Sequence, residues 1–481
     1  MQNFLKKFFK LEERGTTVRI ELIAGLTTFM AMAYILMVNP GMFADPFGDG
    51  TNVLGVSFGA IYIATALSAV IGTLLIGLLA NLPLAQASGM GLNAFFVYTV
   101  CVGLGFTYAN ALLFCLIDGV IFILLTVTGL RRMIFEAVPA AVKAAIPAGI
   151  GLFIAFIGLQ NSKIVIPSTS TGVTMNTFNL LGDATWGTIM PMLLTIAAVI
   201  AIAVMSKKGV RGSILWGILG AAVLYYALGF TVPGFYENFW AGKTMNPFVA
   251  FGDFGTQAIA KVFTEGFNFD AYLAAEGHSV GGLVVAFITT SLAFCMVDMF
   301  DTMGTLYGAC RGGNLLKEND KGELEVPNMD KAMLADAVAT TTGAICGTST
   351  VTTYVESSAG VGAGGRTGLA SVFTAAMFCI ALFLAPVAAL IPACAYAAAL
   401  IYVGILMMAC VKDIDWTDAA IALPAFLTIV MMPFTYNISY GIAFGLISYL
   451  VIKVCIGKIK EVNVGTWVIA ALFAAMFFLT H

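Results

Sequence analysis

The chain has little charge and almost no histidine. Only 10% of its 481 residues are charged and 60% are apolar, whereas a soluble globular domain carries about 25% charged residues. So few polar groups could not cover the surface of a protein in water. The two histidines, His278 and His481, stand far apart and do not supply a zinc site or a histidine-based triad. The composition therefore indicates a membrane protein and excludes these metal and hydrolase classes.

The nine cysteines lack the pairing that metal and redox motifs need. None stands in a CxxC spacing, and most lie inside apolar runs. We interpret them as small, reduced thiols buried in the membrane. No bound metal ion and no enzymatic activity is expected.

Apolar runs recur along the chain at the length that crosses a bilayer. A hydrocarbon core of about 30 Å needs roughly 17–25 helical residues, whereas the strands of a membrane β-barrel are about 10 residues long and alternate in polarity. Because the runs are uniformly apolar, they predict an all-α polytopic membrane protein with about 14 spans. The predicted spans are 21–38, 57–80, 83–101, 109–130, 137–158, 187–205, 212–229, 282–306, 331–347, 352–364, 367–391, 392–411, 418–434 and 438–457. Whether the apolar tail at 467–479 also enters the membrane is left open.

Lysine and arginine are distributed unevenly between the predicted connections. With the N-terminus inside, the inner connections hold Arg131, Arg132, Lys207 and Lys208 among other bases, whereas the long outer connection at 230–281 is mainly acidic. Positive charge is retained on the cytoplasmic side of membrane proteins. The pattern predicts a multi-pass protein of the cell inner (cytoplasmic) membrane with both ends in the cytoplasm.

Two short, glycine-interrupted segments occupy corresponding places in two halves of seven spans. They are 88–94 in the third span and 359–364 in the tenth. A second pair, 139–152 and 392–405, begins with proline and has glycine twelve residues later. Because seven is odd, the halves must be inverted, which predicts a 7+7 inverted repeat with broken third and tenth spans. Such breaks mark transporter binding sites, although glycine runs also serve close helix packing.

Ionisable residues at membrane depth are costly, and each is a functional hypothesis. Glu356 begins the broken tenth span, where freed backbone N–H groups can bind a ligand. Asp301 begins a polar strip inside the eighth span. Asp298, one turn earlier, is interpreted first as an interhelical hydrogen-bond partner. Asp336 and Asp118 are interpreted as structural, with Asp118 a minor candidate for proton coupling.

Two other charged residues, Glu21 and Arg366, stand near span ends. Long charged side chains at such positions extend to the membrane surface. We therefore expect both to reach water rather than to build a site.

Two carboxylates without a lysine or arginine nearby in the sequence suggest a ligand rich in N–H donors, or a cation. A flat heterocycle fits, because carboxylates accept from ring N–H and amino groups, an asparagine serves either polarity, and Phe or Met packs on the ring. Desolvation favours the protonated form of a carboxylic acid, so Glu356 and Asp301 are also the candidates for proton coupling. The predicted substrate-binding residues are Asp301, Glu356, Asn93, Thr305, Val355, Met90, Phe29 and Ser357.

Several motifs, in order along nearly the whole chain, resemble those of the azaguanine-type purine permeases, a branch of the nucleobase–cation symporter-2 family. They are GLTTF at 25–29 with VNP at 38–40, GMGLNAFF at 89–96, FDTMGT at 300–305, GTST at 347–350 with TYVES at 353–357, GRTG at 365–368 and YGIAFG at 440–445. The resemblance implies that substrate lies between spans one, three, eight and ten, with Asp301, Glu356 and Asn93 at the family's binding positions. Ser88 departs from the Pro or Cys of the family pattern, which leaves the local geometry and ligand preference open.

The resemblance also implies a function and a domain division. The expected function is secondary active import of purine nucleobases of the hypoxanthine/guanine/adenine class by alternating access between a core and a gate domain. No cofactor is expected beyond a co-transported cation, for which H⁺ is favoured over Na⁺. The expected partners are a purine nucleobase, the lipid bilayer and a second copy of the chain in a homodimer. Binding of nucleic acid is not expected. The expected division is an N-terminal segment 1–20, a core domain 21–130 and 282–391, a gate domain 131–229 and 392–457, an extracytoplasmic loop 230–281 and a C-terminal tail 458–481.

Other classes stay open from the residues alone. The same seven-plus-seven architecture hosts transporters of sulfate, bicarbonate or carboxylic anions, which should place helix dipoles or a base, rather than two carboxylates, at the broken spans. An intramembrane enzyme would need a nucleophile–base pair or a metal set, which the sequence does not supply. A channel would not need paired carboxylates at discontinuous helices. Spacing alone does not choose among hypoxanthine, guanine, adenine and xanthine.

Overall fold

The computed structural model describes residues 2–128, 138–182, 184–237, 244–275, 279–312, 315–318 and 324–479. Arg131, Arg132, His278 and His481 lie outside these residues. Nine of the described helices are long and apolar enough to cross a membrane, and shorter apolar helices lie between them. The predicted all-α character is confirmed.

After one helix in the N-terminal segment, the helices of the first half lie at the predicted spans. They are α1 (Gln2–Phe9), α2 (Val18–Met32), α3 (Ile35–Ala44), α4 (Phe58–Leu75) with η1 (Ile76–Ala80), α5 (Met90–Ala94) with η2 (Phe95–Gly103), α6 (Tyr108–Thr128), α8 (Ala140–Asn161), α9 (Trp186–Lys207) and α10 (Ser213–Gly229). The expected first span is two helices, because the chain turns between α2 and α3 at Ala33 and Tyr34.

The second half repeats this order. Its helices are α14 (Val280–Gly312), α15 (Met329–Cys346), α16 (Ser357–Gly362), α17 (Gly368–Ala381) with η4 (Leu382–Leu384) and α18 (Ala385–Ala388), α19 (Ala393–Met407) with η5 (Met408–Asp413), α20 (Ala419–Phe434), α21 (Ile438–Cys455), η6 (Ile459–Glu461) and α22 (Val464–Leu479). Helix α22 packs on α14 and α21 and contacts the rings of Tyr440 and Phe444 through Phe477. The apolar tail is therefore part of the helical bundle.

The third and tenth spans are broken as predicted, and each begins with a strand instead of a helix. Strand β1 (Gln86–Ser88) pairs antiparallel with β6 (Val351–Thr353), so that Ala87 lies opposite Thr352. Backbone bonds from Gly89 N–H to the Thr350 carbonyl and from Tyr354 N–H to the Ala85 carbonyl, both 3.0 Å, extend this ribbon. Non-helical backbone at membrane depth must be satisfied by protein, and here each half of the chain satisfies the other.

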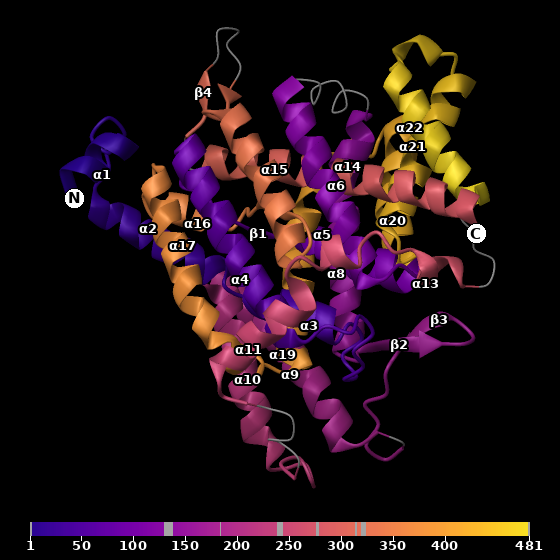
Figure 1. Cartoon of the computed structure of the whole chain (residues 1–481). Coiled ribbons are helices and arrows are strands. Elements are labelled where there is room, and N and C mark those ends of the chain that lie inside the picture. Colours follow the sequence, from indigo (N-terminus) through magenta and orange to yellow (C-terminus); the bar gives the residue numbers. More distant parts are fainter. Residues whose placement is uncertain are drawn as a thin grey trace.

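The long helices pack in two groups (Figure 1). Helices α2, α3, α4 and α6 pack with α14 to α17, and in Figure 1 α2, α16 and α17 lie side by side on the left. Helices α8, α9 and α10 pack with α19, α20 and α21. Fewer contacts join the groups, through pairs such as α3 with α19 and α5 with α8. The division into a core and a gate domain, and their separate movement, stay predictions.

The segment expected to be the long outer loop is partly helical. It contains α11 (Pro247–Asp253), η3 (Phe254–Ala258), α12 (Lys261–Thr264) and α13 (Asp270–Leu273). Helix α11 packs on α4 and α12 packs on α6. The Ser57 hydroxyl donates to Asp253 Oδ2 at 2.8 Å, and the Ser57 N–H donates to Gln257 Oε1 at 2.7 Å. This segment therefore rests on the first helix group.

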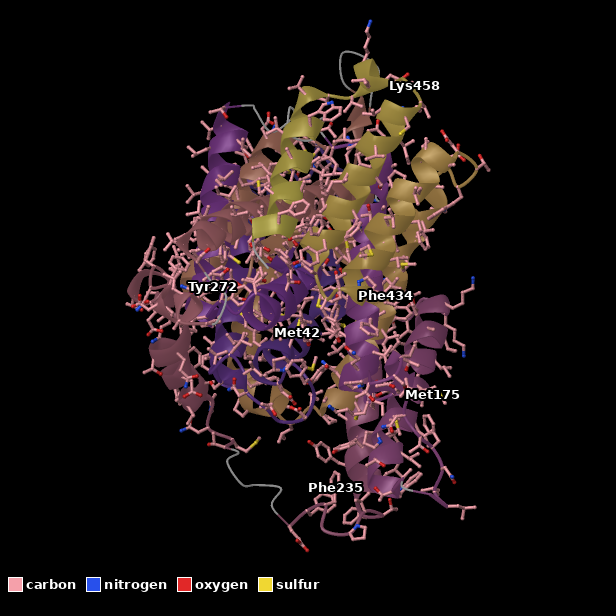
Figure 2. The ribbon with its side chains drawn as sticks, turned by 90° about the vertical axis from the view of Figure 1, so that its right-hand side faces the viewer. Met42, Met175, Phe235, Tyr272, Phe434 and Lys458 are labelled. Carbon is pink, nitrogen blue, oxygen red and sulfur yellow. The ribbon has the colours of Figure 1, made fainter. Side chains whose placement is uncertain are left out.

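Two further ribbons lie outside the bundle. Strands β2 (Val165–Ser168) and β3 (Gly172–Met175) form a hairpin, and β4 (Lys317–Glu318) pairs with β5 (Leu324–Glu325). Figure 2 shows Met175 and Phe235 at one end of the molecule and Lys458 at the other. This separation agrees with the predicted placement of their connections on opposite sides of a membrane.

The expectation that Glu21 reaches water is wrong. Its side chain on α2 is fully buried. Its carboxylate accepts backbone N–H groups of Arg366, Thr367 and Ala370 at 2.9, 3.3 and 3.2 Å, at the start of α17. Unpaired N–H groups at a helix N-terminus attract a negative charge, and this attraction outweighs access to water. Arg366 is half-buried, and its guanidinium donates to the carbonyls of Val361 and Gly365 at the end of α16.

We predict that Glu21→Ala destabilises the bundle. The change leaves buried N–H groups at the start of α17 without their acceptor, which costs about 1–3 kcal/mol. The melting temperature of the detergent-solubilised Glu21→Ala variant should be lower than that of the wild type. Glu21→Gln retains an acceptor oxygen, so its melting temperature should fall less. Equal melting temperatures for the wild type and Glu21→Ala would show that this cap does not matter.

Candidate functional site

A cavity of about 800 Å³ lies between the two helix groups. One wall comes from the turn between α2 and α3, the start of α5, the middle of α14 and the segment from β6 into α16. The opposite wall comes from α8, the α9–α10 connection, α19 and η5. Small-molecule sites are typically clefts of about 300–1,000 Å³, so the cavity is large enough for a flat heterocycle. Both broken spans contribute to it.

Two carboxylates line this cavity, Asp301 from α14 and Glu356 from the tenth span. The Tyr34 hydroxyl donates to Glu356 Oε1 at 2.6 Å, and the Thr352 hydroxyl donates to Asp301 Oδ2 at 3.2 Å. Within the described residues neither carboxylate forms a salt bridge. An ionised carboxylate can accept about four hydrogen bonds, so both retain capacity for a ligand that donates.

The local fold explains how Glu356 reaches the cavity. Strand β6 ends at Thr353, and the Tyr354 hydroxyl crosses the ribbon to donate to the Ser88 carbonyl at 2.5 Å. The chain then turns, and Glu356 directly precedes the short helix α16. The ribbon therefore fixes the backbone, while the side chain after the turn faces the open space.

The cavity contains most of the predicted substrate-binding residues. Those that line it are Asp301, Glu356, Thr305, Val355 and Met90. The Thr305 hydroxyl donates to the Asp301 carbonyl of its own helix at 2.8 Å, which leaves its oxygen as an acceptor. Val355 is 44% exposed, which fits a side chain at the mouth of an open cavity.

Three predicted residues lie behind the lining. Asn93 is fully buried; its Oδ1 accepts from the Ser349 hydroxyl, and its Nδ2 donates to the Ser88 carbonyl at 3.4 Å. The Ser357 hydroxyl accepts the Ala85 N–H at 3.0 Å. Phe29 packs edge-on against Phe378, with ring centroids 5.1 Å apart. In this conformation these side chains support the two broken spans and do not line the cavity.

Sequence reasoning missed several lining residues. Tyr34, which contacts Glu356, has no signal of its own, since it stands in the turn between two helices of one predicted span. Ile214, Tyr402 and Met407 form part of the opposite wall and resemble ordinary membrane-helix residues. Arg211 also lines the cavity; its sequence position indicated only an inner connection.

Buried polar groups hold the ribbon from behind. Asp336 Oδ1 accepts from Gln86 Nε2 at 2.9 Å and from the Thr353 hydroxyl at 3.3 Å, and its Oδ2 accepts from Thr302 at 2.7 Å. These bonds agree with the structural role predicted for Asp336. Ser88, which departs from the family pattern, is accommodated in β1 by a hydrogen bond: its hydroxyl lies 2.7 Å from that of Thr348.

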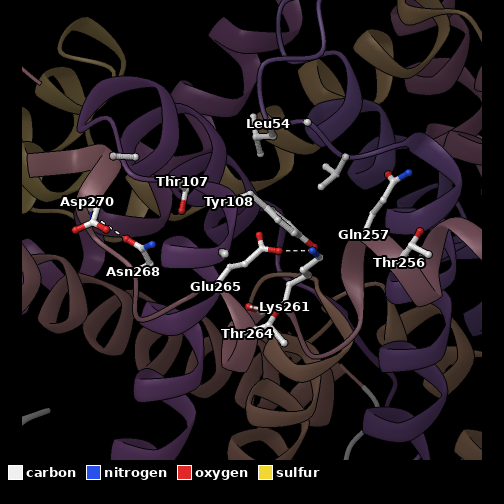
Figure 3. A pocket seen from close by; sticks show the side chains of 14 residues that line it. Leu54, Thr107, Tyr108, Thr256, Gln257, Lys261, Thr264, Glu265, Asn268 and Asp270 are labelled. Carbon is white, nitrogen blue, oxygen red and sulfur yellow. Dashed lines mark hydrogen bonds and ion pairs between the residues drawn. The ribbon is translucent and has the colours of Figure 1, made fainter. Parts of the chain in front are cut away.

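A second pocket, of about 420 Å³, lies against the outer segment (Figure 3). Three charged residues, Lys261, Glu265 and Asp270, line it, and Lys261 and Glu265 are paired with each other. The nearby Tyr108 hydroxyl is bonded to the Gly347 carbonyl at 2.5 Å. None of the predicted substrate-binding residues lines this pocket, so the cavity between the helix groups is the candidate site.

Comparisons with known proteins agree with this assignment. Residues 19–444 match the model of the Permease family. A guanine/hypoxanthine permease of Bacillus subtilis is 40% identical over 461 residues, 95% of this chain and 96% of that protein. Two adenine permeases of Escherichia coli are each 34% identical, over 474 and 470 residues, which is 98% of this chain and 95% of each of those proteins.

A solved structure shows the same fold. The transmembrane domain of the cyanobacterial bicarbonate transporter BicA superposes with a TM-score of 0.55 at 15% sequence identity, covering 88% of this chain and 97% of that one. The predicted 7+7 inverted-repeat fold is confirmed. At this identity the likeness concerns the fold alone.

We predict that Asn93→Ala weakens binding of all purines by a similar factor. The change leaves the Ser349 hydroxyl and the Ser88 carbonyl without their partner, a loss of about 1–3 kcal/mol in stability, and it disturbs both broken spans together. Guanine, hypoxanthine and adenine binding to the purified variant measures this. A changed order of preference, with unchanged stability, would show instead that Asn93 contacts the ring.

Proposed function

The chain belongs to the Permease family, and from this premise we propose that it imports purine nucleobases of the hypoxanthine/guanine/adenine class. The relatives described above include guanine/hypoxanthine and adenine permeases that match it over nearly their whole length. The proposed location is the cytoplasmic membrane, with the N-terminus in the cytoplasm and the protein present as a homodimer.

The observation that supports this substrate class most is the pair of cavity carboxylates. Ring N–H and exocyclic amino groups of a purine donate hydrogen bonds, and Asp301 and Glu356 are acceptors without a cationic partner in the described chain. Phe300, Met90 and Tyr402 line the same cavity and offer apolar surface for the faces of a flat ring. The charge of the two carboxylates and the shape of the cavity therefore both suit a purine.

An inorganic anion fits this cavity less well. Two carboxylates would repel sulfate or bicarbonate, and removing such charges from water is already unfavourable. Arg211 is the one base among the lining residues within the described chain, and it lies on the exposed connection between α9 and α10. The fold is therefore compatible with anion transport, but the side chains that line the cavity are not suited to an anion.

We propose alternating access as the mechanism. Substrate contacts come from the first helix group, whereas the opposite wall comes from the second, so relative movement of the groups would open the cavity to either side. The α9–α10 connection, predicted to be cytoplasmic, borders the cavity, which makes this an inward-open arrangement. A co-transported proton would supply the driving force for accumulation.

Uptake into cells that lack purine transport tests this function. Expression of the chain should produce saturable uptake of radiolabelled hypoxanthine, guanine or adenine that a proton uncoupler abolishes. Excess sulfate and bicarbonate should not compete. Uptake of sulfate without uptake of any purine would overturn the proposal.

We predict that Glu356→Gln abolishes purine accumulation and weakens purine binding at least about tenfold, roughly 1.4 kcal/mol. The substitution removes a charged acceptor, and hydrogen bonds to charged groups contribute about 1.5–3 kcal/mol. Glu461→Gln is the matched control, because Glu461 is an exposed carboxylate paired with Lys453 at 2.7 Å on the C-terminal segment. Binding of wild-type strength in Glu356→Gln would remove Glu356 from the site.

A further inference from the structure

Three fully buried carboxyl groups lie behind the cavity, one on each of α6, α14 and α15. Asp336 on α15 is satisfied by the donors described above. Asp298 on α14 receives the Thr340 hydroxyl, 3.4 Å from its Oδ2, but its Oδ1 has no donor among the described residues. Asp118 on α6 has no donor for either oxygen in the same part of the chain. Buried carboxylates without donors are rare, and these two need an explanation.

Helix α6 packs against α14, and Asp118 and Asp298 lie close enough for their carboxyl groups to interact. The titratable groups around them are Cys115 on α6, Cys295 and Asp301 on α14, and Asp336 on α15. Where α12 packs on α6, Lys261 and Glu265 are paired with each other. The charged groups that act on the two carboxyls are therefore all acidic. No neighbouring cation compensates their charge within the described chain.

The unsatisfied oxygens and the closeness of the two carboxyls favour a shared proton. An ionised carboxylate only accepts, so two ionised carboxylates in contact would repel and leave their oxygens unsatisfied. A buried charge without a partner of opposite sign is strongly unfavourable. A single proton converts one carboxyl into a donor to the other and leaves one negative charge instead of two.

We infer that Asp118 and Asp298 share one proton, and that this pair, behind the cavity, is where the co-transported proton is carried. The inference rests on the proposed function for its transport part. Asp301 and Glu356 then remain available as acceptors for the purine.

The Thr340 hydroxyl connects this pair with the substrate site. It lies 3.4 Å from Asp298 Oδ2 and 3.1 Å from the carbonyl of Val351 in β6. A hydroxyl has one hydrogen and can donate fully to only one acceptor. When the pair loses its proton, the more negative Asp298 attracts this hydrogen and the bond to β6 weakens. The next residue, Thr352, donates to Asp301, so loss of the proton is transmitted to a substrate carboxylate.

Coupling of this kind is reciprocal. If the proton strengthens the contact that orders β6 and Asp301, purine binding must in turn strengthen proton binding by the same factor. Purine affinity should therefore fall as pH rises through the range in which the pair loses its proton. If the pH dependence came only from protonation of Asp301 and Glu356, it would not change when Asp118 is substituted.

Infrared spectroscopy of the purified protein tests the shared proton without any purine. The wild type should show a protonated-carboxyl band that is reduced in Asp118→Asn and in Asp298→Asn. Asp415→Asn, at an exposed carboxyl outside the bundle, should leave the band unchanged. A band of equal size in the wild type and in both pair variants would overturn the shared proton.

Transport in proteoliposomes tests the coupling. With Asp118→Asn we expect exchange of purine across the membrane to continue, while accumulation driven by a pH gradient falls at least about tenfold, within the usual range of coupling. Accumulation that stays at the wild-type level would place the transported proton elsewhere and overturn the inference. Failure of the wild type to transport any purine would contradict the proposed function. The infrared result would still show whether Asp118 and Asp298 share a proton.

Thr340→Val is the second variant, for the case in which Asp118→Asn does not fold. It keeps both carboxyls and removes the hydroxyl between Asp298 and β6. The pH dependence of purine affinity should become flatter than in the wild type. An unchanged pH dependence would show that Thr340 does not transmit the state of the pair.

Discussion

Backbone hydrogen bonding at membrane depth is the constraint on which this structure depends. A break in a membrane helix frees N–H and C=O groups that hydrocarbon cannot satisfy. The chain breaks its third and tenth spans at matching places and pairs the freed segments as β1 and β6. Neither break is stable without the other, so the two inverted halves are joined at the point where the substrate cavity lies.

The polar groups behind the ribbon follow from the same constraint. Asp336 receives donors from β1, β6 and α14 together, and the Asn93 amide connects α5 with Ser349. Buried hydrogen-bond networks of this kind give a site rigidity. The side chains that face the cavity, Asp301 and Glu356, each receive one side-chain donor in the described chain. The site thus combines a fixed backbone with carboxylates that are free to accept from a ligand.

The pair of Asp118 and Asp298 has no comparable support. Both side chains are fully buried, yet three of their four oxygens lack a donor among the described residues. A structural role would be served better by an amide or by an apolar side chain, since buried charges often destabilise. A change of protonation during transport would account for a carboxyl group at both positions.

The sequence predicts the parts of this account that depend on local patterns. Span length locates the helices, and the cost of a buried charge identifies Asp301 and Glu356. The pairing of β1 with β6 joins residues more than 250 positions apart in strands of three residues, too short for a period-2 pattern. The orientation of Asn93 depends on that pairing, and the contact of Tyr34 with Glu356 depends on helix packing, so spacing alone shows neither.

A structure determined with guanine bound tests the central claim most directly. The account predicts the base between the two helix groups, with its N–H and amino groups within hydrogen-bonding distance of Asp301 and Glu356 and its faces against the apolar lining. Guanine bound elsewhere, for example in the outer pocket beside Lys261, or in the cavity without contact to either carboxylate, would contradict it.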